Sequence, residues 1–136
     1  MNLYQRALVF AEDKHKDQKR LGGEPYMVHP IRVAGNFPRN SDEAVVAILH
    51  DVLEDTDAEV SDLFDLGCSQ IVVEAIVALT RMNGEMYFEF VRRALPSVLA
   101  RRVKIFDILD NLRDIDEFKP GLRKRYEKAL SVLRDS

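Results

Sequence analysis

The chain has 136 residues and a formal net charge of −3, with hydrophobic residues at 46% and charged residues at 32%. These values are typical of one soluble globular domain, and a chain of this length buries roughly 68–70% of its unfolded surface without a disulfide or a metal. They exclude a disordered tail, a collagen-like rod and a disulfide-stapled secreted module.

Apolar residues repeat with the period of an α-helix along most of the chain. The LGGEPY segment, Gly67, Pro96 and the KPG segment interrupt this pattern. The segment Asn40-Ser41-Asp42-Glu43 is a typical helix start and leads into the apolar run AVVAILHDVL. In chain order, we predict helices at 2–19, 28–37, 42–53, 58–64, 71–79, 86–95, 98–115 and 122–133.

The fold class follows from this helical period. The β-branched run Ile71-Val72-Val73 could form a strand, but no second run of strand period exists to pair with it. Residues 71–79 are apolar on almost every side, which predicts a helix buried at the centre. We therefore predict a single all-α domain over residues 1–136, a bundle of about seven or eight helices.

Composition also bears on compartment and partners. Cys68 is the only cysteine, and no apolar run approaches the ~20 residues of a spanning helix. Charged residues come before any apolar run long enough for a signal peptide, so we expect a cytoplasmic protein with no membrane partner. The pI of about 5.6 and the lack of a basic stripe with interleaved aromatic residues argue against a nucleic-acid partner.

Charge is distributed unevenly along the chain. Between Arg39 and Arg81 there is no lysine or arginine, whereas acidic residues are frequent there and basic residues gather on both sides. One interpretation is a set of solvated helix faces. The other is an acidic centre that holds a cation, bordered by basic groups that accept an anionic ligand. Composition leaves both interpretations open.

The most informative segment is LHDVLEDT, which contains His50, Asp51, Glu54 and Asp55. If the helix continues, residues four apart share a face, so these four side chains gather closely. Their mutual repulsion is costly, and a bound cation relieves it. The alternative is an ordinary acidic helix end, but acidic residues at a helix C-terminus oppose the helix dipole.

Two further signals are weak when taken alone. His29 is a lone histidine near the start of a predicted helix, and most such residues are ordinary core or surface residues. Lys104, Asp107 and Asn111 lie at i, i+3 and i+7, on one face of a predicted helix, and such polar faces are usually solvated. The third histidine, His15, stands between two lysines and is expected at the surface.

Several segments together resemble the HD-domain metal-dependent phosphohydrolases. The similarity is strongest to their ppGpp-hydrolase branch, which comprises the hydrolase half of RelA/SpoT proteins and the small alarmone hydrolases. It covers about residues 3–115, and its most specific motifs are GEPYxxHPxxVA followed by LHDVxEDT. The matching segments are HKDQKR at 15–20, GEPYMVHPIRVA at 23–34, LHDVLEDT at 49–56, FDLG at 64–67, ALTR at 78–81 and VKIFD…N at 103–111.

The resemblance implies a helical HD fold and a nucleotide substrate, (p)ppGpp, from which the 3′-pyrophosphate is removed to leave GDP or GTP. It implies one Mn²⁺ that activates the attacking water and is held by His29, His50, Asp51 and Asp107. It assigns acid–base and water-positioning roles to Glu54 and Asp55, whose pKa values should be depressed beside a dication unless the groups are buried. The residues that it places at the substrate are Arg20, on the guanine ring, with Lys104 and Asn111 near the metal and nucleotide.

This sequence departs from the family pattern around the expected nucleotide pocket. Leu21 replaces a basic residue, Asp17 replaces a glycine, and Ile108-Leu109-Asp110-Asn111 lacks the usual arginine and histidine. Two alternatives therefore stay open: hydrolysis of another phosphorylated nucleotide, such as (p)ppApp or NADPH, and a nucleotide-binding HD module without turnover. The sequence contains no synthetase segment, so we expect degradation of the alarmone and not its synthesis.

Overall fold

The computed structural model describes residues 1–118 and 120–135, and side chains are described for all of these except 114–118 and 120. In the described ranges the regular structure is helical, with a single isolated bridge between Lys19 and Pro25. The prediction of an all-α fold is confirmed. The elements in chain order are α1 Leu3–His15, α2 Val28–Ala34, α3 Asp42–Leu49, α4 Val52–Asp55, α5 Val60–Leu66, α6 Gln70–Ala78, α7 Tyr87–Arg93, α8 Val98–Phe118, a 3₁₀ turn Pro120–Leu122 and α9 Arg123–Arg134.

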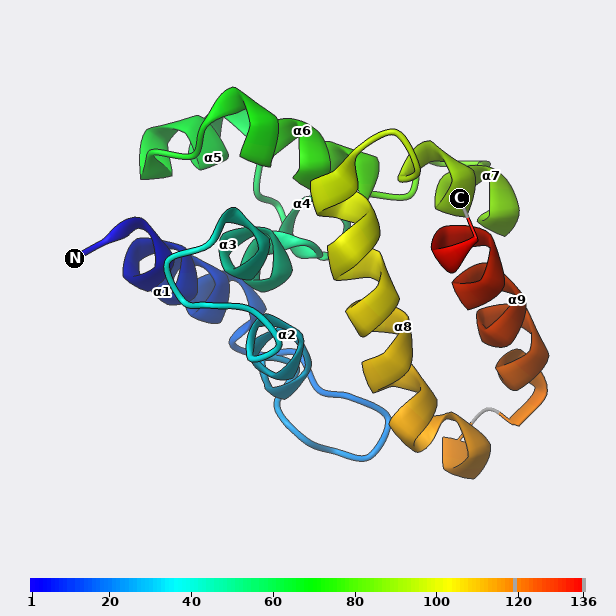
Figure 1. The fold of residues 1–136 in the computed structure, drawn as a ribbon. Coiled ribbons are helices and arrows are strands. Elements are labelled where there is room, and N and C mark those ends of the chain that lie inside the picture. The colour runs from blue at the N-terminus through cyan, green and yellow to red at the C-terminus, as the bar shows by residue number, and fades with distance from the viewer. Residues whose placement is uncertain (119, 136) are drawn as a thin grey trace.

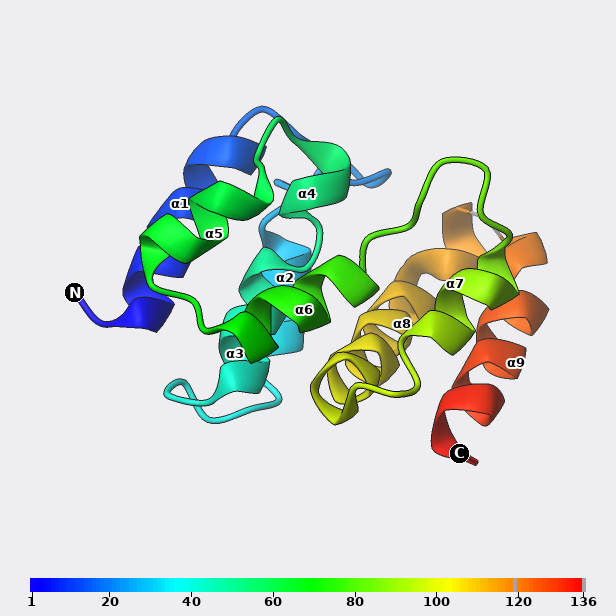
Figure 2. The same cartoon turned by 90° about the horizontal axis from the view of Figure 1, so that it is seen from above.

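Helix α3 forms the centre of the larger core. Its residues from Ala44 to Leu49 are all buried, and it packs against α1, α2, α6 and α8. Ser41 caps its start by accepting a hydrogen bond from the backbone of Ala44, as the sequence predicts. A second, smaller core joins α7, α8 and α9 and contains Val91, Ile108 and Leu133. Figures 1 and 2 show α1 and α5 at one end of the molecule, α7 and α9 at the other, and α8 between them.

The first predicted helix is shorter than expected because the chain turns after His15. The backbone N–H of Gln18 donates to the carbonyl of His15, and the N–H of Arg20 donates to the carbonyl of Glu24. Tyr26 N–H returns to the carbonyl of Gln18, which closes a compact loop between α1 and α2. This loop brings Arg20 beside the residues of α8.

Two other predictions about helices need correction. The helix predicted to run through AVVAILHDVL is interrupted after Leu49, and α4 begins at Val52. Helix α6 is not buried on every side, since Ile71 is 67% exposed while Val72 and Ile76 are buried.

Gly67 ends α5 with φ of 106°, a left-handed conformation that favours glycine, so the predicted stop is confirmed. Among the described helices, none is long and apolar enough to cross a membrane.

Candidate metal centre and the surrounding pocket

Three helices bring two histidines and two aspartates to one point inside the larger core. His29 comes from α2, His50 from the end of α3, Asp51 from the break that follows and Asp107 from the middle of α8. His29 Nε2 lies 2.8 Å from Asp107 Oδ1, and His50 Nε2 lies 3.3 Å from the same oxygen. Asp51 Oδ2 lies 3.0 Å from His50 Nε2. All four residues predicted as ligands therefore meet.

The break after α3 creates this geometry. Nδ1 of His50 is 2.6 Å from the carbonyl oxygen of Ala47 and donates to it, which caps the helix end. Asp51 has φ −106° and ψ −2°, so the chain leaves the helical path there. Glu54 and Asp55 then fall in the first turn of α4 instead of extending the C-terminal end of α3. The interruption thus removes the unfavourable interaction of these acids with the dipole of α3.

The donor set fits a bound cation. Nε2 of His50 is buried and has no hydrogen-bond partner. Because Nδ1 of the same ring carries the hydrogen donated to Ala47, neutral His50 directs the lone pair of Nε2 toward oxygens of Asp51 and Asp107. Lone pairs and carboxylates repel one another at these distances unless a proton or a cation lies between them. Imidazole nitrogens with carboxylate oxygens suit a divalent ion of borderline hardness.

The charges of the cluster reflect this crowding of acids. Burial and repulsion from Asp107 raise the pKa of Asp51 well above its ordinary value. Burial opposes ionisation of Asp107 too, but the charge of Lys104 holds its pKa well below the ordinary value. Lys104 Nζ donates to Asp107 Oδ2 at 2.9 Å, and this carboxylate raises the pKa of Lys104 despite its burial. One aspartate is thus ionised firmly while the other holds a proton readily when no cation neutralises it.

The residues predicted to bind the substrate line the same pocket as three of the four predicted ligands, His29, Asp51 and Asp107. Arg20 Nη2 donates to Asn111 Oδ1 at 3.2 Å, and Asn111 Nδ2 lies 3.5 Å from Asp107 Oδ1. The pocket is an open hollow of about 380 Å³. Its lining consists of Lys19, Arg20, Leu21, Tyr26, His29, Asp51, Lys104, Asp107 and Asn111. The candidate metal centre and three cationic side chains, Lys19, Arg20 and Lys104, therefore face one space large enough for part of a nucleotide.

Glu54 and Asp55 follow the cluster on α4 and are not among the described residues that line this pocket. Glu54 Oε1 accepts a hydrogen bond of 2.7 Å from the backbone N–H of Arg81, in the loop between α6 and α7. The carbonyl of Asp55 accepts one of 2.9 Å from Gln18 Nε2. Partial burial, followed by repulsion from Glu54, raises the pKa of Asp55. The depressed pKa expected beside a dication is therefore not found in the metal-free chain, because this carboxyl group is partly buried.

His15 is buried, contrary to the expectation that it lies at the surface. Only 1% of it is exposed, and its Nδ1 lies 2.9 Å from Gln18 Oε1. Its ring contacts the ring of Tyr26 at 4.6 Å between centroids, and the hydroxyl of Tyr26 donates to Asp51 Oδ2. The lysines beside it in sequence suggest exposure, but His15 continues the buried i, i+4 row of Ala7 and Ala11, which is the signal that identifies it.

Asp110 is a further residue of the centre that the sequence does not predict. It is 7% exposed, and its Oδ2 lies 2.6 Å from His29 Nδ1. Arg32 Nε donates to its Oδ1 at 2.7 Å. Burial opposes ionisation, but the hydrogen bonds from His29 and Arg32 lower the pKa of Asp110 to about 2. The spacing of Asp107 and Asp110, i and i+3 on α8, is the signal that places both beside α2.

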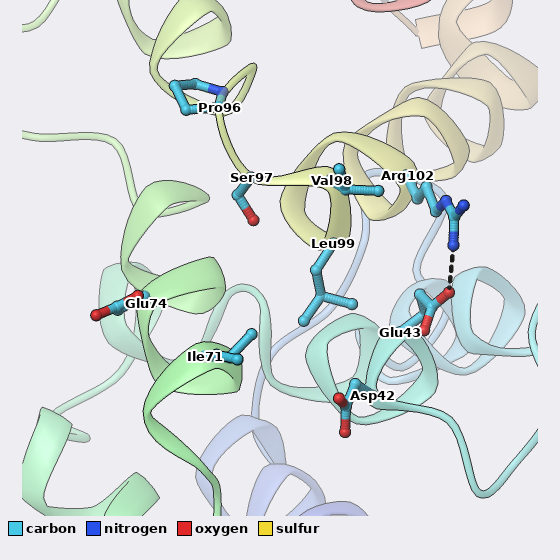
Figure 3. Close-up of a pocket in the computed structure, with 9 residues that line it drawn as sticks. All are labelled: Asp42, Glu43, Ile71, Glu74, Pro96, Ser97, Val98, Leu99 and Arg102. Carbon is cyan, nitrogen blue, oxygen red and sulfur yellow. Dashed lines mark hydrogen bonds and ion pairs between the residues drawn. The ribbon is translucent and has the colours of Figure 1, made fainter.

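A second hollow, about 530 Å³ and also open, lies between the starts of α3 and α8 and the side of α6 (Figure 3). Its lining includes the exposed apolar side chains Ile71 and Val98. It also includes Glu43, which pairs with Arg102 at 3.1 Å. None of the predicted site residues belongs to its lining. Size alone therefore does not identify the functional site, whereas the convergence of metal-ligating side chains does.

In the described residues the domain is helical and gathers two histidines and two aspartates beside a pocket lined by cationic side chains. This combination is typical of a helical domain that binds a metal ion. The sequence pattern of the HD domain matches residues 7–132. The chain therefore belongs to the HD-domain family, for which a bound divalent metal is the expectation. The His29, His50 and Asp107 ligand atoms, all within 4.8 Å of one another, form a possible site for it.

Comparison with individual proteins shows which members of the HD-domain family this chain is similar to. A guanosine-3′,5′-bis(diphosphate) 3′-pyrophosphohydrolase of Aquifex aeolicus is 31% identical over 135 residues, which are 91% of this chain and 19% of the relative. A probable enzyme of the same name from Synechocystis is 36% identical over 133 residues, 88% of this chain and 18% of the relative. The chain thus spans about a fifth of the length of these curated relatives.

A solved structure shows the same fold. It belongs to work on a metazoan ortholog of SpoT, which is described as hydrolyzing ppGpp and acting in starvation responses. The TM-score is 0.79 at 25% sequence identity, with 98% of this chain and 85% of that chain covered. The resemblance to the RelA/SpoT hydrolase group is confirmed by these comparisons.

Proposed function

We propose that this domain is a Mn²⁺-dependent hydrolase that removes the 3′-pyrophosphate from (p)ppGpp and leaves GDP or GTP. The observation that carries the proposal is the buried cluster of His29, His50, Asp51 and Asp107 beside the pocket of Arg20. Relatives named for this activity match most of the chain, which supports the same substrate class. In the reaction the bond between the ribose O3′ and phosphorus breaks, O3′ gains a proton, and pyrophosphate takes the oxygen of water.

The proposed ligands of the ion are His29, His50, Asp51 and Asp107. Two imidazoles and two carboxylates leave coordination positions for water and substrate on an ion such as Mn²⁺. When bound, the ion supplies Lewis-acid polarisation of water and of phosphoryl oxygens. Tyr26 supports this ligand set because its hydroxyl donates to Asp51 Oδ2 and restricts that carboxylate.

Glu54 and Asp55 are proposed to orient the attacking water and to transfer protons. Their place on α4, directly after Asp51, sets them at the edge of the centre without making them part of the buried cluster. The raised pKa of Asp55 is suited to proton exchange closer to neutral pH than an ordinary aspartate allows. Arg81 N–H fixes one oxygen of Glu54, which leaves its other oxygen for the reaction.

The basic residues of the pocket are proposed to bind the nucleotide. Arg20 presents a planar guanidinium that stacks on a purine better than a lysine ammonium does. Asn111 restrains that guanidinium by accepting from Nη2. Lys104 lies against Asp107, so its charge is placed where phosphate oxygens approach the proposed ion.

A product assay tests the proposal and separates it from the alternatives. Purified protein with added Mn²⁺ is incubated with ppGpp, ppApp and NADPH in parallel, and the products are resolved by anion-exchange chromatography. We expect ppGpp to give equal amounts of GDP and pyrophosphate. Turnover of only ppApp or NADPH would assign a different nucleotide substrate, and no turnover of any of the three by Mn²⁺-loaded protein would contradict a hydrolase function.

A further inference from the structure

Asp110 joins two helices beside the metal centre and also lies next to the proposed substrate pocket, since Arg20 Nη1 is 3.6 Å from its Oδ2. Its Oδ2 lies 2.6 Å from His29 Nδ1, and its Oδ1 accepts a hydrogen bond of 2.7 Å from Arg32 Nε. Arg32 Nη2 makes a second bond of 3.2 Å to Oδ2, so the guanidinium grips both oxygens. His29 and Arg32 are one turn apart on α2, and a single carboxylate of α8 therefore holds both.

This contact decides which nitrogen of His29 faces the metal cluster. A neutral imidazole has one N–H and one lone pair, and the hydrogen bond made by one nitrogen fixes the role of the other. Asp110 Oδ2, which also accepts a hydrogen bond from Arg32 Nη2, lies 2.6 Å from Nδ1 and places the hydrogen of a neutral ring on that nitrogen. Nε2 is then the nitrogen left to coordinate a cation, and in the metal-free chain it lies within hydrogen-bond distance of Asp107 Oδ1, at 2.8 Å.

His50 achieves the same result by a different contact. Its Nδ1 donates to the backbone carbonyl of Ala47, an acceptor that belongs to its own helix. His29 has no such local acceptor for Nδ1 and depends on a side chain 81 positions away. An anionic acceptor also makes the ring more basic and restricts its rotation, both of which strengthen a histidine ligand.

We propose that Asp110 is a positioning residue that, together with Arg32, fixes His29 as an Nε2 ligand and thereby sets the affinity of the centre for its divalent cation. The inference depends on the proposed function only for the presence of that cation, and not for the substrate. Asp110 is not a ligand itself, because its near oxygen is occupied by His29 Nδ1 and by Arg32.

The test measures Mn²⁺ binding by the purified full chain without nucleotide, using the electron paramagnetic resonance signal of the free ion. Asp110→Asn keeps the shape and a neutral acceptor, and we expect it to weaken Mn²⁺ binding by roughly 10- to 100-fold. Asp110→Ala removes the acceptor and should weaken binding further. Arg32→Met, which keeps the carboxylate but loses its anchor, should have a smaller effect than Asp110→Ala.

Matched measurements distinguish positioning from general damage. Asp57→Asn removes an exposed aspartate paired with Lys14 and should leave Mn²⁺ binding unchanged. Nitrogen-15 spectra of labelled histidine in the metal-free protein at high pH should show His29 with its hydrogen on Nδ1, and Asp110→Ala should lose that preference. Mn²⁺ affinity within twofold of wild type in both Asp110 variants would overturn the proposal. A wild-type protein that binds Mn²⁺ but does not cleave ppGpp would defeat the proposed function and leave this inference standing.

Discussion

The two buried histidines of the centre each use Nδ1 for a hydrogen bond to the protein and keep Nε2 for the cluster. The acceptor is a carboxylate for His29 and a backbone carbonyl for His50, so the same orientation is reached by unlike means. Asp51 is restrained in turn by the hydroxyl of Tyr26. At this scale the candidate site consists of proposed ligands whose side chains are held in position by neighbouring groups.

The acidic pair on α4 allows binding to be separated from chemistry. Glu54→Gln and Asp55→Asn should each retain Mn²⁺, because neither is a proposed ligand, and should lose turnover of ppGpp by roughly 10²–10⁴-fold. Steady-state rates at saturating Mn²⁺, together with elemental analysis, check both parts. Glu74→Gln, on the exposed side of α6, is the matched control and should keep wild-type rates. Loss of metal in either α4 variant would make that carboxylate a ligand, and full activity in both would make the pair structural.

Arg20 gives a prediction about specificity. Stacking of a guanidinium tolerates either purine, whereas discrimination needs hydrogen bonds to the base edge, and Leu21 supplies none. We expect ppApp to compete with ppGpp within roughly two orders of magnitude in kcat/KM, and Arg20→Ala to weaken both about equally. Competition assays measure the ratio, with Arg102→Ala in the other hollow as the control. A larger preference for ppGpp would show that other groups read the guanine edge.

At the scale of elements, the loop between α6 and α7 holds Glu54 in place through an ion pair. Glu85 receives hydrogen bonds of 2.7 and 2.8 Å from Arg93, whose guanidinium also donates to the carbonyl of Thr80. The loop then presents the N–H of Arg81 to Glu54. The ion pair between this loop and α7 thus acts on Glu54 through the backbone of the loop.

The ion pair has a defined dependence on pH. Hydrogen bonds from Arg93 and from the Met82 backbone lower the pKa of Glu85 from 4.5 to about 2. A carboxyl with a depressed folded pKa stabilises the fold above its unfolded pKa and loses that contribution as pH falls through the folded value. The Tm difference between wild type and Glu85→Gln should therefore be full above about pH 4.5 and shrink toward pH 2. Thermal melts across this range check it, and a difference independent of pH would contradict the assignment.

At the scale of the whole molecule, metal binding should contribute to stability because the four proposed ligands come from three distant parts of the chain. A ligand that binds only the folded state at 100 times its Kd stabilises it by about 2.7 kcal/mol. Mn²⁺ should accordingly raise the Tm of wild type by several degrees. The Asp51→Ala variant, which lacks one ligand, should show little shift in the same scanning calorimetry. An equal shift in both proteins would place the ion elsewhere.

Sequence patterns predict the helices well and their interruptions poorly. The apolar period and the Ser41 cap identify α3, but its end depends on the hydrogen bond from His50 to Ala47, which no spacing reveals. The flanking lysines predict that His15 lies at the surface, but it continues the row of Ala7 and Ala11, which is buried. Local pattern thus determines the elements, while side-chain contacts determine where they stop.

In the candidate site, too, local sequence patterns predict some of the residues, and contacts in the folded chain determine the others. The residues of LHDVLEDT stand out in sequence because four chemically demanding side chains are adjacent. Asp107 and His29 become meaningful only through resemblance, since they are 78 positions apart. Asp110 escapes detection because its partners His29 and Arg32 lie on another helix. Contacts over such separations are a property of the folded chain and are not visible as spacing.

The central claim is that a single divalent ion in this cluster is required for release of pyrophosphate from ppGpp. Titration of metal-free protein with Mn²⁺ while pyrophosphate release is measured tests it most directly. The account predicts a rate that rises linearly and reaches a plateau at about one equivalent of Mn²⁺, with no comparable rate in Asp51→Ala. Undiminished release of pyrophosphate in excess chelator, or none at any amount of Mn²⁺, would contradict it.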